Sequence, residues 1–140
     1  IFTTPVEAEA AFYDALARSD LEAMMAVWSE DEEVVCVHPG GPRVVGLPAI
    51  RESWRQLFQG SPRLTIRLTN QLVVSNMMMA LHTLLEHVAL AGSNESPPPP
   101  VIATNVFTRG AHGWRMVAHH ASPTPETEDP MADGLPRTVH

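Results

Sequence analysis

The sequence predicts an α+β domain in which a strongly curved, mostly antiparallel sheet is covered by three N-terminal helices. Three observations carry this expectation. Apolar residues recur at helical spacing through the first 28 residues, Pro48 opens a third helical pattern, and from Leu64 onward the apolar period becomes two. Helices followed by antiparallel strands are typical of a two-layer α+β arrangement. A curved sheet covered in this way encloses a conical space, where small molecules commonly bind.

Each of the three helices has its own start signal. Thr4, Pro5 and Glu7 form a capping box with a proline at the first helical position. A second box that ends at Glu22 starts a short second helix, and Pro48 starts the third. The apolar stripes predicted to face the sheet are Val6, Ala10, Tyr13, Leu16 and Ala17 in the first helix, Leu21, Met24, Met25 and Trp28 in the second, and Ile50, Trp54, Leu57 and Phe58 in the third.

The strands are predicted from apolar runs and from alternation. The apolar run 34–37 is predicted to be the first strand. Segment 64–68 alternates as a half-exposed strand should, and residues 72–74 are expected to continue this strand after a bend. Three longer strands are expected at 77–90, 101–109 and 114–121, the last two joined by a turn at 110–113. The proline-rich loop 92–100 is expected to be a stiff spacer, with a ligand for a proline-recognition domain as the alternative.

Composition limits the classes of function. The 140 residues suffice for one domain with a single core. The net charge is −7 and the basic residues are scattered arginines, so a nucleic-acid groove is not expected. We expect no membrane span, and the N-terminus lacks the pattern of a secretion signal. A single cysteine, Cys36, excludes an internal disulfide and fits a reducing compartment, so we expect a cytoplasmic protein.

One stretch, Ser29 to Trp54, organises the rest of the chain. It reads SEDEEVVCVHPGGPRVVGLPAIRESW, with His38 at the point where a strand ends and a Pro-Gly-Gly turn begins. This arrangement resembles the nuclear-transport-factor-2-like (NTF2-like) superfamily, and within it the SnoaL-like and ketosteroid-isomerase-like members. The resemblance covers about residues 5–122. It implies a cone-shaped domain at 1–122, after which the polar segment 123–140 is expected to be a poorly ordered tail.

The resemblance implies catalytic roles for two residues. In ketosteroid-isomerase-like proteins an Asp just before the Pro of this turn moves a proton on the substrate. His38 stands in its place, and a histidine can perform this transfer; the alternative is that it only hydrogen-bonds the turn. Asn105 falls where the isomerases bind the developing oxyanion with a protonated Asp, and an amide can also donate there. The isomerases' other oxyanion donor, a Tyr on the first helix, aligns with Phe12, one residue before Tyr13.

Strand alternation predicts which side chains face the pocket. Asn105 shares a strand face with Ala103 and Phe107. If that face lines the pocket, Asn105 points inward, and if it does not, Thr104 does. Glu86 lies among apolar neighbours, where an unpaired carboxylate is unfavourable. It either faces the pocket with a raised pKa or points outward at a sheet edge or dimer surface. The predicted pocket wall consists of Tyr13, Trp28, Trp54, Glu86, Phe107 and His120.

Adjacent residues of a strand point to opposite faces, so His119 and His120 cannot bind one metal ion together. No metal site is therefore predicted. His120 shares parity with Trp114, and we expect it, rather than His119, in the pocket wall. Cys36 shares a face with His38, and an inert buried thiol is favoured over a Cys–His nucleophile pair.

Two hypotheses for function follow, and the sequence leaves open whether the protein is an enzyme. The first is an enzyme without a cofactor, which moves a proton on a mostly apolar, carbonyl-containing small molecule in an isomerase, cyclase or hydro-lyase reaction. The second is a non-catalytic ligand-binding or protein-assembly module of the same fold. In either case we expect a homodimer through the outer face of the sheet, because segment 80–90 has apolar residues of both parities.

Overall fold

The computed structural model describes residues 1–60 and 62–124. Of the predicted tail, residues 125–140 lie outside this part. No helix of the described residues is long and apolar enough to cross a membrane. The described elements are α1 (Pro5–Arg18), α2 (Leu21–Met25), β1 (Val35–Val37), β2 (Arg43–Val45), α3 (Leu47–Phe58), β3 (Leu64–Ser75), β4 (Met79–Leu90), β5 (Val101–Gly110) and β6 (Gly113–Pro123).

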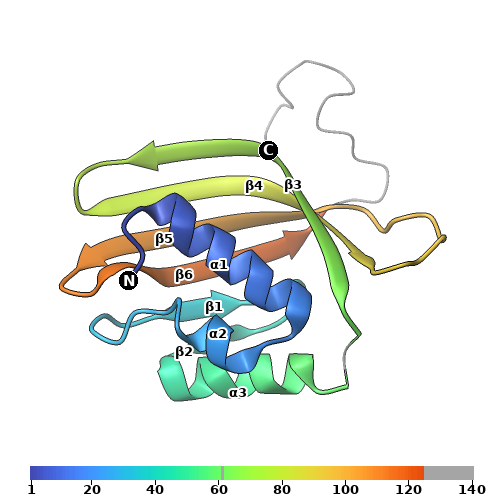
Figure 1. The fold of residues 1–140 in the computed structure, drawn as a ribbon, viewed down its shortest axis with the longest axis horizontal. Helices are drawn as coiled ribbons and strands as arrows, with labels where there is room; N and C mark the ends of the chain where they lie inside the picture. Colours follow the sequence, from blue (N-terminus) through green and yellow to red (C-terminus); the bar gives the residue numbers. More distant parts are fainter. Residues whose placement is uncertain (61, 125–140) are drawn as a thin grey trace.

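The strands of the described residues form one six-stranded sheet in the order β2-β1-β6-β5-β4-β3. All neighbouring strands are antiparallel except β1 and β6, which run parallel. Helix α1 crosses one face of the sheet, and α3 lies beside β2 (Figure 1), which is at the opposite edge from β3 in the strand order. The predicted α+β class, with N-terminal helices and a mostly antiparallel sheet, is confirmed. The closure of the sheet into a cone stays a prediction.

Helix α1 begins as predicted, because the Thr4 side chain accepts a 3.1 Å hydrogen bond from the Glu7 N–H. The predicted apolar stripe is wrong at its start, since Val6 is 64% exposed. Relative to the predicted orientation, the helix is rotated about its axis by about one residue, roughly 100°, so that the fully buried Phe12 faces the sheet. Burying Phe12 removes more apolar area from water than burying Val6 would. The buried residues of α1 are Ala8, Glu9, Phe12, Tyr13 and Ala15.

Two strands contain irregularities that redirect side chains. In β3 the pairing register shifts between Thr69 and Leu72, where Asn70 has a φ of 56°, and the strand changes direction (Figure 1). In β6 the register with β5 shifts between the pairs Val106–Ala118 and Phe107–Met116. Val117 is therefore an extra residue without a partner on β5, which defines a β-bulge.

The hydrophobic core lies between the helices and one face of the sheet. Its largest side chains with no exposure include Phe12, Met24, Trp28 and Ile50 from the helical side and Phe107 from β5. Trp28 is tied to the sheet by a bridge with Met116 of β6. The residues that the sequence singled out as pocket wall on the helices therefore pack against the inner face of the sheet.

Candidate functional site

A group of polar side chains lies within the packed layer between α1 and the sheet, each at most 6% exposed. Alternation turns His82 and Glu86 of β4 to the inner face, and i, i+4 spacing places Glu9 and Tyr13 on one side of α1. Buried polar groups are unfavourable unless they bond to one another, and most of these do. The group, here called the buried polar chain, consists of Glu9, Tyr13, His82, Glu86, Asn105 and His119.

Asn105 is the centre of the buried polar chain. Its Nδ2 donates to the Glu9 Oε2 and to the Tyr13 hydroxyl, each at 3.0 Å. Its Oδ1 lies 2.6 Å from Nδ1 of His119. Because the Glu9 carboxylate accepts hydrogen bonds, the amide NH₂ must face it, which fixes the orientation of the amide. Asn105 therefore points inward, the first of the two directions left open by the sequence, and both of its donor hydrogens are already used inside the protein.

Tyr13 and Glu86 extend the chain from α1 to β4. The Tyr13 hydroxyl donates to Glu86 Oε2 at 2.7 Å. Burial raises the pKa of Glu86 to about 7, and the hydrogen bond from Tyr13 partly opposes this effect. Burial and the nearby Glu86 charge raise the pKa of Tyr13 well above its usual value. Glu86 therefore faces inward with a raised pKa, the first of its two predicted interpretations, and Tyr13 stays protonated.

Glu9 also lies beside His82, which the sequence did not single out. Nδ1 of His82 is 3.0 Å from Oε2 of Glu9. The contact is within ion-pair distance but lacks the angles of a hydrogen bond, and neither ring nitrogen of His82 has a hydrogen-bond partner among the described residues. The His82 ring packs on Phe107, with 5.1 Å between the ring centroids. His82 thus joins the buried polar chain through its proximity to the Glu9 carboxyl group.

The prediction that His120 lines the pocket is wrong, and His119 lies inside instead. His119 is 3% exposed, whereas His120 is exposed on the other face. The physical reason is the bulge at Val117, which adds one residue to β6 and reverses the parity beyond it. Trp114 remains buried on the inner face before the bulge. Burial lowers the pKa of His119 to about 3, so the ring is neutral.

His38 is half-buried at the end of β1. Its Nε2 lies 3.0 Å from Ser53 Oγ, and the Ser53 hydroxyl donates to the Ile50 carbonyl at 2.8 Å. Because that hydroxyl hydrogen is used, Nε2 of His38 is the donor to Ser53, and Nδ1 has the lone pair. Burial lowers the pKa of His38. Cys36, 3.9 Å from the same nitrogen, is buried with a pKa raised to about 12, which fits the inert thiol predicted for it.

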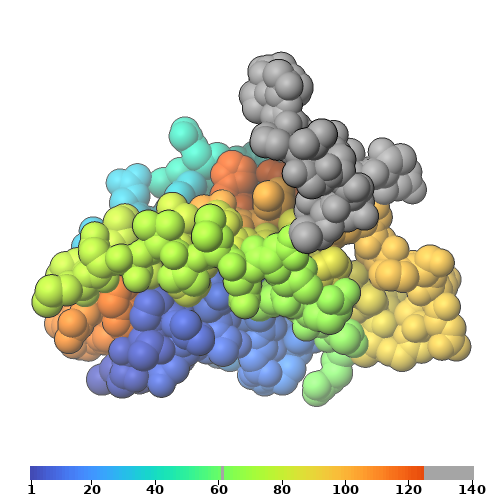
Figure 2. Space-filling model, turned by 90° about the horizontal axis from the view of Figure 1, so that it is seen from above, coloured from blue at the N-terminus to red at the C-terminus, as the bar shows by residue number. Residues whose placement is uncertain are grey.

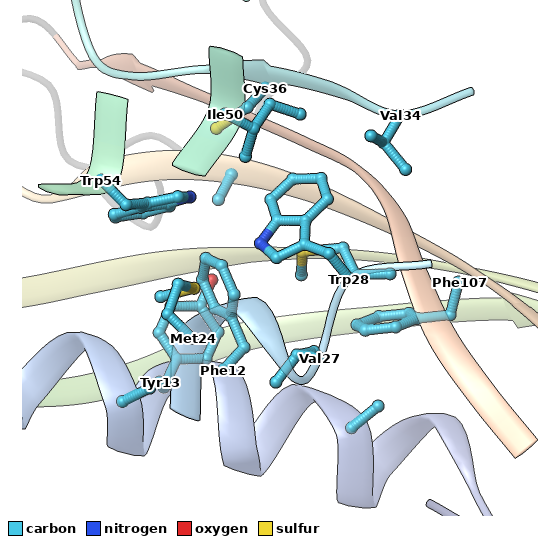
Figure 3. Packing of buried hydrophobic residues seen from close by; sticks show 14 of the residues in the cluster. Phe12, Tyr13, Met24, Val27, Trp28, Val34, Cys36, Ile50, Trp54 and Phe107 are labelled. Atoms are coloured by element: carbon cyan, nitrogen blue, oxygen red, sulfur yellow. The ribbon is translucent and has the colours of Figure 1, made fainter. Parts of the chain in front are cut away.

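Aromatic rings separate His38 from the buried polar chain. The Trp54 ring meets the His38 ring edge to face at 4.6 Å and the His119 ring at 6.2 Å. Phe12 packs on Trp54 and His119 at 5.7 and 4.7 Å. The indole nitrogens of Trp28 and Trp54 are buried without a hydrogen-bond partner among the described residues. In Figure 3 both nitrogens point into the core.

The structure therefore brings together most, but not all, of the predicted site. Tyr13, Glu86 and Asn105 share hydrogen bonds, and Trp54 lies against His38. His38 and Asn105 do not touch, because Trp54 and His119 lie between them. Trp28 and Phe107 are buried in the same layer. No group of three or more His, Cys, Asp or Glu side chains in residues 1–60 and 62–124 is arranged to hold a metal ion.

Sequence reasoning missed Glu9 and His82 and chose the wrong member of the His119–His120 pair. A carboxylate on a helix is usually solvent-exposed, so Glu9 carried no sign of burial by itself. Its spacing of four residues from Tyr13 was the available signal. His82 shares strand parity with Glu86, and an inward Glu86 implies an inward His82.

The helices, strand order and inner polar face define a domain of the NTF2-like class. The family model described as "SnoaL-like domain" matches residues 6–126, and the chain belongs to this family. The predicted resemblance to the SnoaL-like branch is confirmed.

Three solved structures illustrate the range of proteins with this fold. A provisionally assigned calcium/calmodulin-dependent protein kinase type II association domain from Thiobacillus denitrificans is 37% identical, with a TM-score of 0.79 over 89% of this chain and 98% of that one. A provisionally assigned NTF2-like dehydratase from Streptomyces avermitilis is 31% identical, with a TM-score of 0.75 over 84% and 91%. A provisionally assigned ketosteroid isomerase from Parabacteroides distasonis, 18% identical with a TM-score of 0.71 over 90% and 92%, shows the fold alone.

Among curated proteins, the F-box protein SKIP8 of Arabidopsis thaliana is 25% identical over 111 residues. The match covers 79% of this chain and 46% of SKIP8, so the chain spans about half the length of this relative.

Proposed function

We propose that the protein binds an apolar, carbonyl-containing small molecule between α1, α3 and the inner face of the sheet, and that it moves a proton on this ligand. The reaction class is that of an isomerase, a cyclase or a hydro-lyase. His38 acts as the base. Tyr13 and Asn105 stabilise the negative charge that develops on the carbonyl oxygen. No cofactor is needed for such a transfer between positioned groups.

The observation that carries the proposal is the state of His38. Its Nε2 is engaged by Ser53, its ring is held against Trp54, and no hydrogen bond from the described residues reaches Nδ1. A lowered pKa keeps the ring neutral near pH 7. A neutral imidazole with one nitrogen held and the other available is the form that accepts a proton. His38 is also only half-buried, so part of its side chain is accessible to a ligand.

The oxyanion role rests on Tyr13 and Asn105, whose donors converge in the interior. The Tyr13 oxygen and the Asn105 Nδ2 are 3.0 Å apart, and each donates to a buried carboxyl group. A ligand oxygen would replace Glu86 or Glu9 as the acceptor. A pKa of about 7 lets Glu86 take up a proton and leave that position uncharged. Because the layer between α1 and the sheet is packed, a ligand could enter only if neighbouring rings moved. Trp54 and Phe58, whose ring centroids are 5.4 Å apart, are the rings expected to move.

The family supports a reaction of this class without identifying it. Its solved relatives include the provisional dehydratase, at 31% identity, and structures of the same fold include the provisional isomerase. Dehydration and isomerisation next to a carbonyl both begin with removal of a proton from carbon, which needs a base and a stabilised oxyanion.

Histidine titration by NMR tests the proposal. His38 is expected to titrate below the usual histidine pKa, and its signals should shift when a matching member of a panel of hydrophobic carbonyl compounds binds. His38→Gln should abolish proton exchange at the α-carbon of that compound. His112→Gln, at an exposed histidine in the β5–β6 turn, is the matched control and should have no effect. A His38 that titrates normally and responds to no compound would end the enzyme proposal.

A second candidate function, protein assembly, is favoured by the β3–β4 hairpin. Residues 68–85 contain no Asp, Glu, Lys or Arg. The exposed apolar side chains of this hairpin, here called the hairpin patch, are Leu72, Val73, Val74, Met77, Met78, Met79 and Leu81. Strand β3 is the last strand of the described sheet, and Figure 2 looks onto this edge, which the residues of β3 cover. Such a large exposed apolar patch typically marks an interaction site.

For this second candidate we propose that a second copy of the chain covers the hairpin patch and the adjoining outer face of the sheet, where Leu81 and Ile102 are exposed. An uncharged apolar surface matches another of the same kind without unpaired charges. The provisional association domain, at 37% identity, is a relative whose name denotes assembly.

Sedimentation over a range of concentrations tests the dimer. The unmodified protein is expected to be a dimer and the Val73→Lys variant a monomer. Val6→Lys, at an exposed apolar position on α1, should remain a dimer. A monomeric unmodified protein at all concentrations would exclude this candidate.

A further inference from the structure

The hydrogen bonds of the buried polar chain determine the tautomer of His119. Asn105 uses its two amide hydrogens on Glu9 and Tyr13, so its Oδ1 is left to face the histidine. A carbonyl oxygen only accepts, and Nδ1 of His119 must therefore carry the hydrogen. With a neutral ring, the lone pair is on Nε2. The uncommitted nitrogen of the inner histidine is thus an acceptor, as is that of His38.

The strand order indicates where this nitrogen points. Strand β6 lies between β5 and β1, and Nδ1 of His119 is directed to Asn105 on β5. The two nitrogens of an imidazole point away from one another, so Nε2 is directed away from β5, on the side of β6 where β1 lies. There Cys36 pairs with His119 in the parallel register, and His38 follows on the same face two residues later. No described residue donates a hydrogen bond to Nε2.

A second polar group next to His119 also lacks a partner. The Trp54 indole N–H is buried and has no acceptor among the described residues, and the Trp54 ring contacts both His38 and His119. The interior beside Trp54 therefore has one acceptor without a donor and one donor without an acceptor. An unpaired buried donor such as the Trp54 N–H is unfavourable, and a bound polar group could accept from it and donate to Nε2 of His119.

We propose that His119 is a ligand-contacting residue whose Nε2 accepts a hydrogen bond from a hydroxyl group of the ligand, with Trp54 Nε1 donating to the same oxygen. Asn105 is then a positioning residue for His119 as well. This inference rests on the proposed function and narrows its ligand class to apolar molecules that carry a hydroxyl or enol group. A hydroxyl can donate and accept at once, which neither an ether nor a bare carbonyl can do.

Histidine ¹⁵N spectra of the full chain test the proposal with two matched probes, 2-naphthol and 2-methoxynaphthalene. The spectra distinguish protonated from unprotonated ring nitrogens, and signals are assigned with His119→Gln and His120→Gln variants. We expect His119 in the Nδ1–H tautomer, with an Nε2 signal that shifts on addition of 2-naphthol but not of the methyl ether. Affinity for 2-naphthol should exceed that for the ether by roughly ten-fold, as expected of one buried hydrogen bond.

The controls separate this inference from the proposed function. In His119→Phe the preference for the hydroxyl should fall to near unity, whereas in His120→Gln, at an exposed position, it should persist. Asn105→Leu should release His119 from the Nδ1–H tautomer. If His38 responds to both probes and His119 to neither, the proposed binding site is supported but the proposed ligand contact of His119 is wrong. An Nε2–H tautomer in the unmodified protein likewise overturns it. If neither histidine responds to either probe, this inference fails, whereas the response of His38 to the carbonyl panel decides separately whether the proposed function holds.

Discussion

The hydroxyl of Tyr13 on α1 donates a 2.7 Å hydrogen bond to the carboxyl group of Glu86 on β4. This bond links the helical layer to the sheet at a point where both residues are almost fully buried. Burial disfavours the charged form of Glu86 more strongly than the single donor from Tyr13 supports it, and the net effect is a pKa raised to about 7. The same pair that holds α1 in place is therefore sensitive to pH.

We predict that Glu86→Gln reduces the loss of stability between pH 5 and pH 8. The folded protein binds the Glu86 proton more tightly than the unfolded chain, whose pKa is near 4.5. The contribution of this group is thus fully present below pH 4.5 and declines as the pH rises toward 7. The decline amounts to roughly 3 kcal/mol, and an uncharged glutamine lacks it. Urea unfolding at the two pH values measures the difference.

Glu52→Gln provides the control for this measurement. Glu52 is an exposed carboxylate of α3 paired with Arg55, and its removal should leave the decline of stability between pH 5 and pH 8 unchanged. Parallel pH dependences for Glu86→Gln and the unmodified protein would show that Glu86 does not have the raised pKa.

Removal of the Tyr13 hydroxyl should destabilise the fold. In Tyr13→Phe, Glu86 loses its donor and Asn105 loses one of its acceptors. Leaving buried groups unpaired costs roughly 1–3 kcal/mol. A double-mutant cycle with Glu86→Gln, followed by urea unfolding at pH 7, should give a coupling energy of roughly 0.5–3 kcal/mol. Strict additivity of the two substitutions would contradict a direct interaction.

Most of the fold could be predicted because its signals are local. The Thr4 cap, the Pro48 helix start and the period of two after Leu64 each specify an element without reference to the rest of the chain. The rotation of α1 could not be predicted in this way. Val6 and Phe12 are both apolar, and only packing against the finished sheet decides which of them is buried.

The site was less predictable because one inserted residue in β6 reverses which of the following side chains point to the interior. Nothing in the segment around Val117 marks a bulge, and the parity rule therefore assigned His120 to the interior instead of His119. Glu9 was missed because its burial depends on Asn105 and His82, which are distant in the sequence. Parity placed Asn105 on the same strand face as Phe107, but neither parity nor the apolar neighbours of Glu86 could decide whether these side chains point inward.

The turn between β5 and β6 provides a matched glycine pair. Gly113 has a φ of 83°, and a Cβ there would lie 2.6 Å from the Phe2 carbonyl oxygen. Gly110 lacks a positive φ, and a Cβ would meet nothing within 4 Å. Gly113→Ala is expected to cost roughly 1–3 kcal/mol through backbone strain and displacement of Phe2, whereas Gly110→Ala should change stability by about 0.5 kcal/mol or less. Thermal unfolding of both variants distinguishes these outcomes, and equal effects would mean that Phe2 does not pack on this turn.

The adjacent histidines of β6 allow the bulge itself to be tested. His119→Ala removes a buried ring that bonds to Asn105 and packs on Phe12. It leaves a cavity and an unpaired carbonyl oxygen, at a cost of roughly 2–5 kcal/mol. His120→Ala removes an exposed ring and should change the free energy of unfolding by about 0.5 kcal/mol or less. Urea unfolding of the two variants gives the comparison. A larger effect at His120 would mean that β6 alternates regularly and has no bulge at Val117. A larger effect at His119, as expected, would establish that His119 is the histidine inside the domain.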